Sequence, residues 1–290
     1  MQFLRDLALE IITQIVNINT IAKLLASFIL IIAGYFGKLI YNFFKLFKIK
    51  NVLSLRKTNC QVIISTIEGN FYYKENNELS HIKQFDSIVT VYNVNILTNL
   101  LQSLGKKYQL TKIRRYNENF DFTKNTFSIG GFFVNRYNSY LFNEYFHMIK
   151  FYYPKSRADR YPHVKNIIAT DDKENCRICI ENTDKSFEYK YSMESYIILI
   201  KLSGKYFFDC PSMGTTHIAF GKDHTATKTS INIFEKASKF LYKKLKFRKN
   251  YFIIIGCDAY GKIDFNKYHD WSDYVFKDKK YPIDKIEKDS

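Results

Sequence analysis

The sequence has little of what interrupts regular structure or cross-links a small fold. Among 290 residues there are 4 prolines, 11 glycines and 1 tryptophan, and we find no low-complexity tract and no internal repeat. Solenoid, collagen-like and disordered architectures are therefore excluded. The 5 cysteines are odd in number and scattered, so a disulfide framework is excluded as well, and reduced thiols in a cytosolic domain are expected.

Aromatic rings and positive charge are abundant instead. Phe and Tyr number 26 and 23, and apolar residues make up 46% of the chain, which is enough to bury a sizeable core. The formal net charge of +16 favours anionic partners, namely nucleotides, nucleic acid or an anionic lipid surface. Charge alone does not choose among these partners, and solubility explains it equally well.

A hydrophobic segment lies near the N-terminus. Residues 24–37 carry no charge, and a second apolar stretch follows Lys38. The uncharged run alone would make about 21 Å of helix, which is short of the roughly 30 Å hydrocarbon core of a bilayer. Because the stems of Lys23 and Lys38 can reach the two interfaces, we predict one membrane-spanning helix over about residues 20–44, with the lipid bilayer as a partner.

The flanking charges give this helix a direction. The basic residues that follow its uncharged run, with no acid among them, are Lys38, Lys45, Lys48, Lys50, Arg56 and Lys57. Before it, two acidic residues balance two basic ones. The positive-inside rule therefore predicts a single-pass protein of the inner (plasma) membrane, with residues 1–50 as a helical anchor and residues 51–290 as a cytoplasmic domain.

Two alternatives compete with a membrane span. The uncharged run is short enough for a helix that is buried in the protein core or lies in the membrane interface. A cleaved signal peptide is the other alternative, but Asp6 and Glu10 precede the apolar run where a signal peptide has basic residues.

Residues 51–290 alternate strand-like and helix-like patterns. Short β-branched or aromatic runs predict strands at 61–66, 125–131, 175–182, 187–193, 195–202, 205–210, 216–221 and 251–257. Apolar residues at helical spacing predict a helix that Gly105 ends and helices over about 133–147 and 225–246, whereas residues 151–166 are expected to form an exposed basic loop. This order predicts an α/β fold, namely a three-layer Rossmann-like sheet, mostly parallel, with a β-rich insertion.

Two predicted strand-to-helix junctions have the residue types of an anion-binding site. In an open parallel sheet, ligands bind beyond the carboxyl ends of the strands, where helix N-termini offer N–H groups. The candidate ligand-binding residues are Gly130, Gly131, Asn135 and Arg136 at the first junction, and Gly221, Lys222, His224, Thr225 and Lys228 at the second. The alternatives are a tight-turn role for the glycines and an N-cap role for Asp223 or Thr225.

Patterns for catalysis and metal binding are sparse. Glu144 and Glu194 are the candidate catalytic residues, each near the end of a predicted element, and a solvated carboxylate is the alternative for both. Four residues with metal-ligating side chains could meet, namely Cys176, Cys179, Cys210 and His217. The two cysteines of the C-x-x-C pair would point to opposite faces of a strand, so we expect neither a metal nor a cofactor. Nucleic acid is not expected as a partner, because the lysines near residue 240 occupy the polar face of a helix.

The glycine pair with Asn135, followed by strand-Gly221-helix-strand, resembles the Rossmann-like nucleotide-sensor domains of prokaryotic conflict systems, among them the SLOG, TIR and nucleoside deoxyribosyltransferase-like families. The resemblance is carried by Gly130, Gly131, Asn135 and Gly221 and extends over about residues 60–257. It implies a domain that recognises a nucleotide or cyclic nucleotide.

Joined to a membrane helix, such a domain looks like a homo-oligomeric effector of antiviral defence in which ligand binding changes the assembly and disturbs the bilayer. The alternatives are a membrane-tethered enzyme that processes NAD or nucleosides through Glu144 or Glu194, and a non-catalytic anchor for a protein partner.

Overall fold

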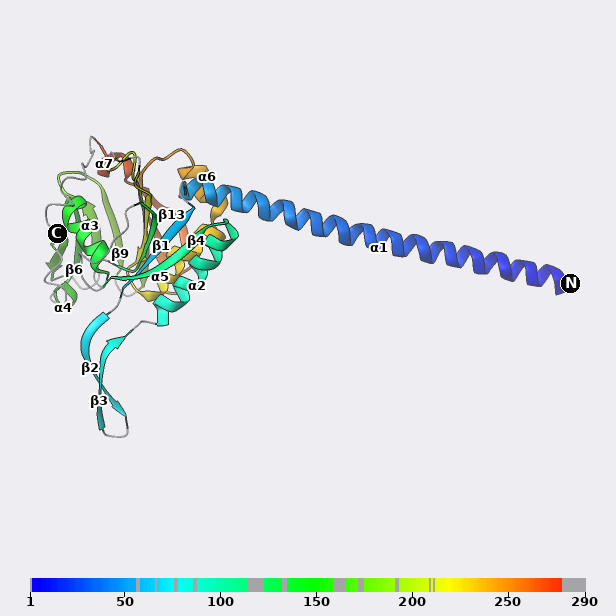
Figure 1. Cartoon of the computed structure of the whole chain (residues 1–290), viewed down its shortest axis with the longest axis horizontal. Helices are drawn as coiled ribbons and strands as arrows, with labels where there is room; N and C mark the ends of the chain where they lie inside the picture. The colour runs from blue at the N-terminus through cyan, green and yellow to red at the C-terminus, as the bar shows by residue number, and fades with distance from the viewer. Residues whose placement is uncertain are drawn as a thin grey trace. The chain divides into compact units, whose positions relative to one another are not determined.

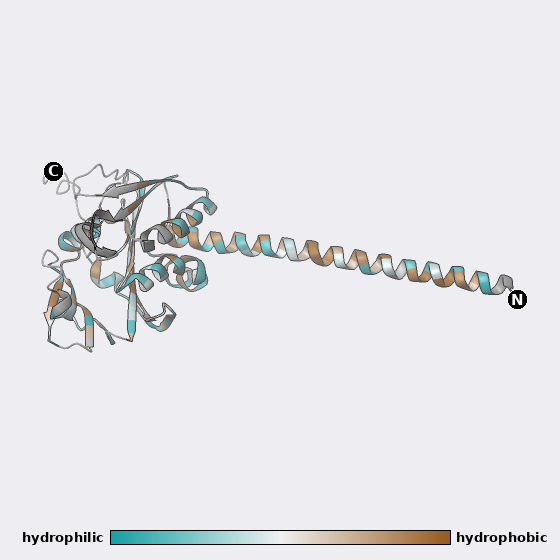
Figure 2. Cartoon of the chain, turned by 90° about the horizontal axis from the view of Figure 1, so that it is seen from below, coloured by the Kyte–Doolittle hydropathy of each residue, from teal (hydrophilic) through white to brown (hydrophobic). Residues whose placement is uncertain are grey.

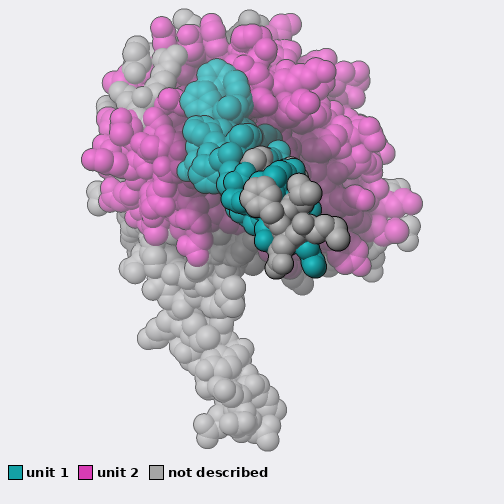
Figure 3. Space-filling model, turned by 90° about the vertical axis from the view of Figure 1, so that its right-hand side faces the viewer, with its two compact units in different colours: residues 1–47 teal, residues 48–290 magenta. Residues whose placement is uncertain are grey.

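The structure is a computed structural model. It describes residues 2–55, 58–65, 67–75, 78–85, 88–113, 123–131, 135–158, 165–171, 175–190, 193–208, 210 and 212–277. The chain divides into two compact units, residues 1–47 and residues 48–290, which are coloured separately in Figure 3.

The N-terminal helix α1 (Gln2–Leu53) is continuous over 52 residues. From Arg5 to Phe44 every described side chain is exposed, although many are large and apolar, and Figure 2 shows the hydrophobic colour along the helix. Among the described residues, Arg5–Leu53 is the one helix that is long and apolar enough to cross a membrane. At 1.5 Å per residue, α1 is about 78 Å long, so the predicted span over residues 20–44 is part of a longer helix.

The last turn of α1 belongs to the second unit. Ile49, Val52 and Leu53 are buried in the core of that unit, together with Leu55 just beyond the helix. Ser54 ends the helix, since its φ of 49° lies in the left-handed region. The exposed apolar side chains of residues 5–44 thus give way to buried ones within a single helix.

A seven-stranded mixed sheet forms the centre of the second unit, in the order β13-β12-β10-β11-β5-β1-β4. Its strands are β1 (Asn59–Ser65), β4 (Lys107–Ile113), β5 (Asn125–Ile129), β10 (Glu194–Ser203), β11 (Thr215–Gly221), β12 (Tyr251–Asp258) and β13 (Ile263–Asp270). Strands β4, β1, β5 and β11 are mutually parallel. Strand β10 is antiparallel to both β11 and β12, and β13 is antiparallel to β12.

Alternating side chains of the central strands pack into two separate hydrophobic cores, one on each face of the sheet. On β10, Ile197 and Leu199 lie in one core, while Ile198 and Ile200 lie in the other. The first core is completed by the end of α1 and by helices α2 (Ile88–Ser103), α5 (His224–Lys236) and α6 (Ser238–Leu245). Because successive side chains of a strand point to opposite faces, the sheet is covered on both sides.

One helix and a second sheet complete the second core. Helix α3 (Arg136–Tyr145) contributes Phe142, which packs edge-on against Phe220 of β11. The four-stranded sheet has the order β7-β6-β8-β9, with strands β6 (Ile149–Pro154), β7 (Ile167–Thr170), β8 (Asn175–Ile180) and β9 (Ser186–Lys190). Figure 1 shows α3, β6 and β9 on one side of the central sheet and α2, α5 and α6 on the other.

Shorter elements complete the unit. Strands β2 (Ile67–Glu75) and β3 (Glu78–Phe85) pair as an antiparallel hairpin. Helices α4 (Lys155–Ala158) and α7 (Ser272–Val275) are single turns. The chain is therefore mixed α/β with an apolar N-terminal helix, as the sequence predicts at that level.

Several sequence predictions are wrong in detail. The strand expected at 205–210 is absent from the described residues of that stretch, 205–208 and 210, and β11 and β12 already occupy both hydrogen-bonding edges of β10. The expected basic loop at 151–166 begins instead with β6, whose Phe151 and Tyr153 are fully buried, and residues 159–164 lie outside the described part. The helix expected over 225–246 is two helices, because Ala237 leaves helical geometry with φ −120° and ψ 25°.

Candidate functional site

The two junctions that the sequence singled out lie side by side. Strands β5 and β11 are parallel neighbours, with Ile129 paired to Ala219, so their carboxyl ends reach the same edge of the sheet. The Gly130 N–H donates to the Ala219 carbonyl at 3.3 Å. This edge is where ligands bind in open α/β sheets, and we call it the carboxyl edge.

At the β5–α3 junction, Asn135 holds the backbone together. It is 1% exposed, and its Oδ1 accepts the N–H groups of Tyr137 and Asn138 at 3.1 and 3.2 Å as the N-cap of α3. Its Nδ2 donates to Ser128 Oγ at 3.0 Å and to the Ile129 carbonyl at 2.9 Å. These four bonds saturate the Asn135 amide, so this side chain has a capping role in the structure.

The neighbouring predicted residues frame this cap. Gly130 has a φ of +102°, which side chains rarely adopt, and its carbonyl accepts a hydrogen bond from Asn138 Nδ2 at 2.7 Å. Gly131 is buried. Arg136 begins α3, and its side chain lies outside the described part of the structure. The backbone of Gly130 therefore fits the tight-turn alternative, and no such backbone requirement is seen at Gly131 among the described residues.

At the β11–α5 junction, a carboxylate already sits at the helix N-terminus. Asp223 is the N-cap of α5, with Oδ1 accepting from the Ala226 N–H at 2.8 Å and Oδ2 accepting from Ser195 Oγ at 2.9 Å. A Cβ on Gly221 would lie 2.3 Å from the Ala226 Cβ, so only glycine permits this close approach. Asp223 fills the position in which an anionic ligand would meet the positive end of the α5 dipole.

The other predicted residues at this junction divide between interior and surface. Lys222 is 8% exposed, and its Nζ donates to the Glu194 carbonyl at 2.5 Å and lies 5.4 Å from the centre of the Tyr189 ring. His224 and Lys228 are exposed, and Thr225 is half-buried. The last three are therefore the predicted ligand-binding residues that remain accessible at the carboxyl edge.

A cavity of about 360 Å³ lies at the same edge, where Glu194 faces the end of β12. Glu194 Oε1 is 2.6 Å from Lys267 Nζ, and Oε2 accepts the Lys190 N–H at 3.1 Å. The hydrogen bond from Lys267 is the main cause of a lowered Glu194 pKa. A carboxylate held ionised in this way is a poor general acid.

Neither the remaining cavity residues nor Glu144 strengthens a catalytic site. Burial raises the pKa of the Cys257 thiol to about 12, which keeps it protonated and unreactive. Asp258 Oδ1 accepts two backbone N–H groups of its own turn. Glu144 is exposed on the last turn of α3. Among the described residues, no group of His, Cys, Asp and Glu could hold a metal ion.

A different polar cluster, which the sequence did not predict as a site, surrounds the end of α1. Four consecutive backbone carbonyls there each lie within hydrogen-bond distance of a different side chain of the domain. The contacts are Val52 O with Lys201 Nζ at 3.4 Å, Leu53 O with His217 Nε2 at 2.8 Å, Ser54 O with Thr215 Oγ1 at 3.4 Å, and Leu55 O with Lys106 Nζ at 3.1 Å. These groups, which we call the α1 collar, satisfy carbonyls that have no partner within the helix.

The electrostatics of the α1 collar suit a helix C-terminus. Lys201 is 1% exposed and also donates to the Arg248 carbonyl at 2.6 Å, so a buried ammonium meets the negative end of the α1 dipole. Burial lowers the pKa of His217 to about 3, helped by the charge of Lys201. The neutral imidazole must carry its proton on Nε2, since a carbonyl oxygen only accepts. Its Nδ1 has no hydrogen-bond partner in the described part of the chain.

One sequence signal could have found this cluster. Lys201 and His217 each interrupt an otherwise apolar run, SYIILIKLS and THIAFG, in a strand that must be buried on both faces. A polar side chain at such a position needs a partner, because an unpaired one is costly. What the sequence does not show is that the partner is the backbone of a helix that lies about 150 residues earlier in the chain.

Comparison of the chain with protein-family models, with curated proteins and with solved structures finds no match. A function must therefore be inferred from the geometry and charge described above.

Proposed function

We propose that this chain is a single-pass membrane protein whose soluble domain binds a nucleotide-derived signal and passes the binding event to its membrane helix. One observation carries the proposal: α1 has exposed apolar side chains over residues 5–44, whereas its last turn is buried in the domain core. In water, so many exposed apolar side chains are unfavourable, and a bilayer removes them from contact with water. The basic residues after the apolar run favour a cytoplasmic domain at the inner membrane.

The α1 collar gives a physical route from ligand to helix. Three of its side chains come from β10 and β11 of the central sheet, and the fourth, Lys106, directly precedes β4. A ligand that favours one arrangement of these strands would alter the hydrogen bonds that hold the end of α1. In the proposed mechanism this changes the oligomeric state and disturbs the bilayer, as expected of an effector in antiviral defence.

A Rossmann-like layering of the domain is part of the same proposal. It is supported by the covering of the central sheet on both faces and by the crossover from β11 through α5 and α6 to β12. The positive net charge of the chain favours an anionic ligand. His224, Thr225 and Lys228 are accessible to such a ligand at the carboxyl edge.

The test uses the full chain in lipid nanodiscs with a panel of NAD, nucleoside monophosphates and cyclic dinucleotides. A rise in melting temperature with at least one nucleotide, together with a change in oligomer mass, is expected. If the protein turns over a nucleotide, and Glu194→Gln or Glu144→Gln abolishes that turnover, the chain is an enzyme and the sensor proposal is wrong. If no nucleotide changes the melting temperature or the oligomer mass, the remaining function is that of a non-catalytic anchor for a protein partner.

A further inference from the structure

A basic cavity of about 190 Å³ lies beside the end of α1, at the edge of the sheet opposite to the carboxyl edge. Four of its lining residues are basic and four carry hydroxyl groups. They are Lys201, Lys246, Arg248 and Lys249, and Ser54, Ser203, Tyr206 and Thr215, with Phe247 as the ninth. None of these described lining residues is acidic. Ammonium groups and hydroxyls are the side chains that bind phosphate oxygens.

Lys201 makes this cavity more than a patch of surface charge. Its side chain is 1% exposed, and its Nζ donates to Ser54 Oγ at 3.2 Å and to the Arg248 carbonyl at 2.6 Å. Both acceptors are uncharged. The second carbonyl that Lys201 reaches, Val52 O, belongs to the α1 collar. These three acceptors use the three N–H groups of the ammonium, so an anion in the cavity would be attracted by the charge of Lys201 without a direct hydrogen bond from it.

A larger hollow of about 820 Å³ shares Phe247, Arg248 and Lys249 with the basic cavity. Three aromatic side chains line it, Phe247, Tyr274 and Phe276. The other lining residues that it does not share with the basic cavity are polar or charged, namely Asn250, Ser272, Asp273 and Lys277. Phe247 is 86% exposed, so the face of its ring that Lys246 does not cover is accessible from solvent. Nucleic bases stack on aromatic rings with little regard to base identity.

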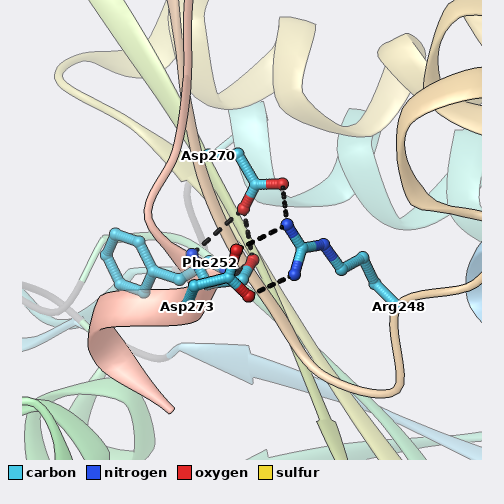
Figure 4. Close-up of polar contacts among 5 residues, drawn as sticks. Arg248, Phe252, Asp270 and Asp273 are labelled. Carbon is cyan, nitrogen blue, oxygen red and sulfur yellow. Dashed lines mark hydrogen bonds and ion pairs between the residues drawn. The ribbon is translucent and has the colours of Figure 1, made fainter. Parts of the chain in front are cut away.

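Arg248 lines both the basic cavity and the larger hollow, and two aspartates neutralise its charge. Figure 4 shows its guanidinium between Asp270 and Asp273. Nη2 lies 3.2 Å from Asp270 Oδ2 and donates to Asp273 Oδ2 at 2.9 Å, while Nη1 donates to Asp273 Oδ1. The cationic groups left to face a ligand from the surface are those of Lys246 and Lys249, which stack over Phe247 at 4.6 Å and Tyr206 at 4.2 Å.

We propose that the basic cavity binds the phosphate group of a nucleotide, whose base stacks on the aromatic side chains of the adjoining hollow. The cavity is smaller than the roughly 300–1,000 Å³ of pockets that enclose whole ligands, so it suits a single phosphate group. The inference deepens the proposed function and rests on it for the nucleotide. We prefer this cavity for the phosphate to the carboxyl edge, where His224, Thr225 and Lys228 are accessible but the Asp223 carboxylate already caps α5 and Lys267 is paired with Glu194.

The test compares two double variants of the full chain in detergent. Lys246→Gln with Lys249→Gln removes two cavity charges, and Lys239→Gln with Lys243→Gln removes two exposed charges of α6 that do not line the cavity. Binding of AMP, adenosine and inorganic phosphate is measured by calorimetry. Because hydrogen bonds to charged groups are strong, we expect the cavity variant to weaken AMP binding about tenfold or more and the control variant to leave it within about twofold. Adenosine should bind far more weakly than AMP.

The outcomes separate this inference from the proposed function. Equal AMP affinity in both variants would overturn the cavity as the site and leave nucleotide sensing intact. If the wild type binds inorganic phosphate but no nucleotide, and only the cavity variant loses phosphate binding, the cavity is supported as a phosphate site and nucleotide sensing is overturned. Tighter binding to nanodiscs containing phosphatidic acid, again lost only in the cavity variant, would support the phosphate site with a lipid headgroup as its source. No binding of any phosphate compound to the wild type would overturn the inference.

Discussion

The buried imidazole of His217 makes the stability of the domain depend on pH. Its ring is stacked on Phe127 at 5.0 Å, and the titratable side chains that face it are Lys201 and Tyr251. Burial, with a smaller contribution from the charge of Lys201, lowers its pKa from 6.5 to about 3, against the opposing effect of the hydrogen bond to the Leu53 carbonyl. Protonation would therefore place a second charge beside Lys201 at the end of α1.

The sign and size of the effect follow from this shift. Above pH 6.5 the imidazole is neutral in the folded and unfolded chains, so its contribution to stability is constant. As the pH falls from 6.5 towards 3, the unfolded chain takes up a proton that the folded chain does not, and the free energy of unfolding decreases. One pKa unit corresponds to about 1.36 kcal/mol, which gives a loss of about 2 kcal/mol at pH 5 and about 4 kcal/mol at pH 3, where the folded chain is itself about half protonated.

The assay is urea denaturation of the full chain in detergent at pH 7 and pH 5, followed by the fluorescence of Trp271. This residue is the only tryptophan of the chain and is buried in the second core, so it reports unfolding of the domain. The control is His217→Gln, whose amide can still donate to Leu53 but cannot titrate. His269, whose pKa burial also lowers, is present in both proteins and cancels. An equal loss of stability in wild type and variant between the two pH values would refute the reasoning.

Three further substitutions test the packing and capping of the domain, each by urea denaturation at pH 7. Gly221→Ala should destabilise the domain by about 1–3 kcal/mol, because the new methyl group would lie 2.3 Å from the Ala226 Cβ; an unchanged midpoint would show that α5 moves aside freely. Phe142→Ala should cost about 3–5 kcal/mol, since the ring is fully buried among other aromatic rings, and a loss below about 1 kcal/mol would contradict that packing. Asn135→Ala should lower the free energy of unfolding by about 2 kcal/mol, because the α3 cap and the hydrogen bond to the Ile129 carbonyl are lost. An unchanged free energy of unfolding would show that the cap does not stabilise the domain.

Local patterns in the sequence predict much of the fold. The run YFIIIGC predicts the buried strand β12, and Gly105, with its φ of +69°, ends α2 as expected. Such features are determined by neighbouring residues. Residues 149–153 do carry a strand signal, because Ile149, Phe151 and Tyr153 alternate with a period of two, whereas the prolines and basic residues of 151–166 favour a loop.

The features that the sequence does not predict depend on partners far along the chain. Strand 205–210 was predicted from its composition, and only the pairing of β10 with β11 and β12 excludes it. The N-cap role of Asp223, which accepts the Ala226 N–H, is local and is one of the alternatives that the sequence offers, whereas its contact with Ser195 joins residues 28 positions apart and is not predicted. Lys201 and His217 are visible as polar residues in apolar strands, but their common partner at the end of α1 is not.

Asp223 and the α1 collar together suggest how the two ends of the sheet differ. At the carboxyl edge, the carboxylates of Asp223 and Glu194 offset nearby positive groups. At the opposite edge, the buried ammonium of Lys201 is joined by Lys246 and Lys249 around one cavity. This difference is the reason that we place the proposed phosphate site at the edge that holds the end of α1.

The central claim is that α1 spans the membrane with the domain on the cytoplasmic side, and protease accessibility after alkaline washing of membranes tests it most directly. Full-length protein carrying a C-terminal epitope should stay in the membrane pellet after the wash. The epitope should resist protease added to intact spheroplasts and be digested in inverted vesicles. Protein released by the wash, or an epitope digested in intact spheroplasts, would contradict the account.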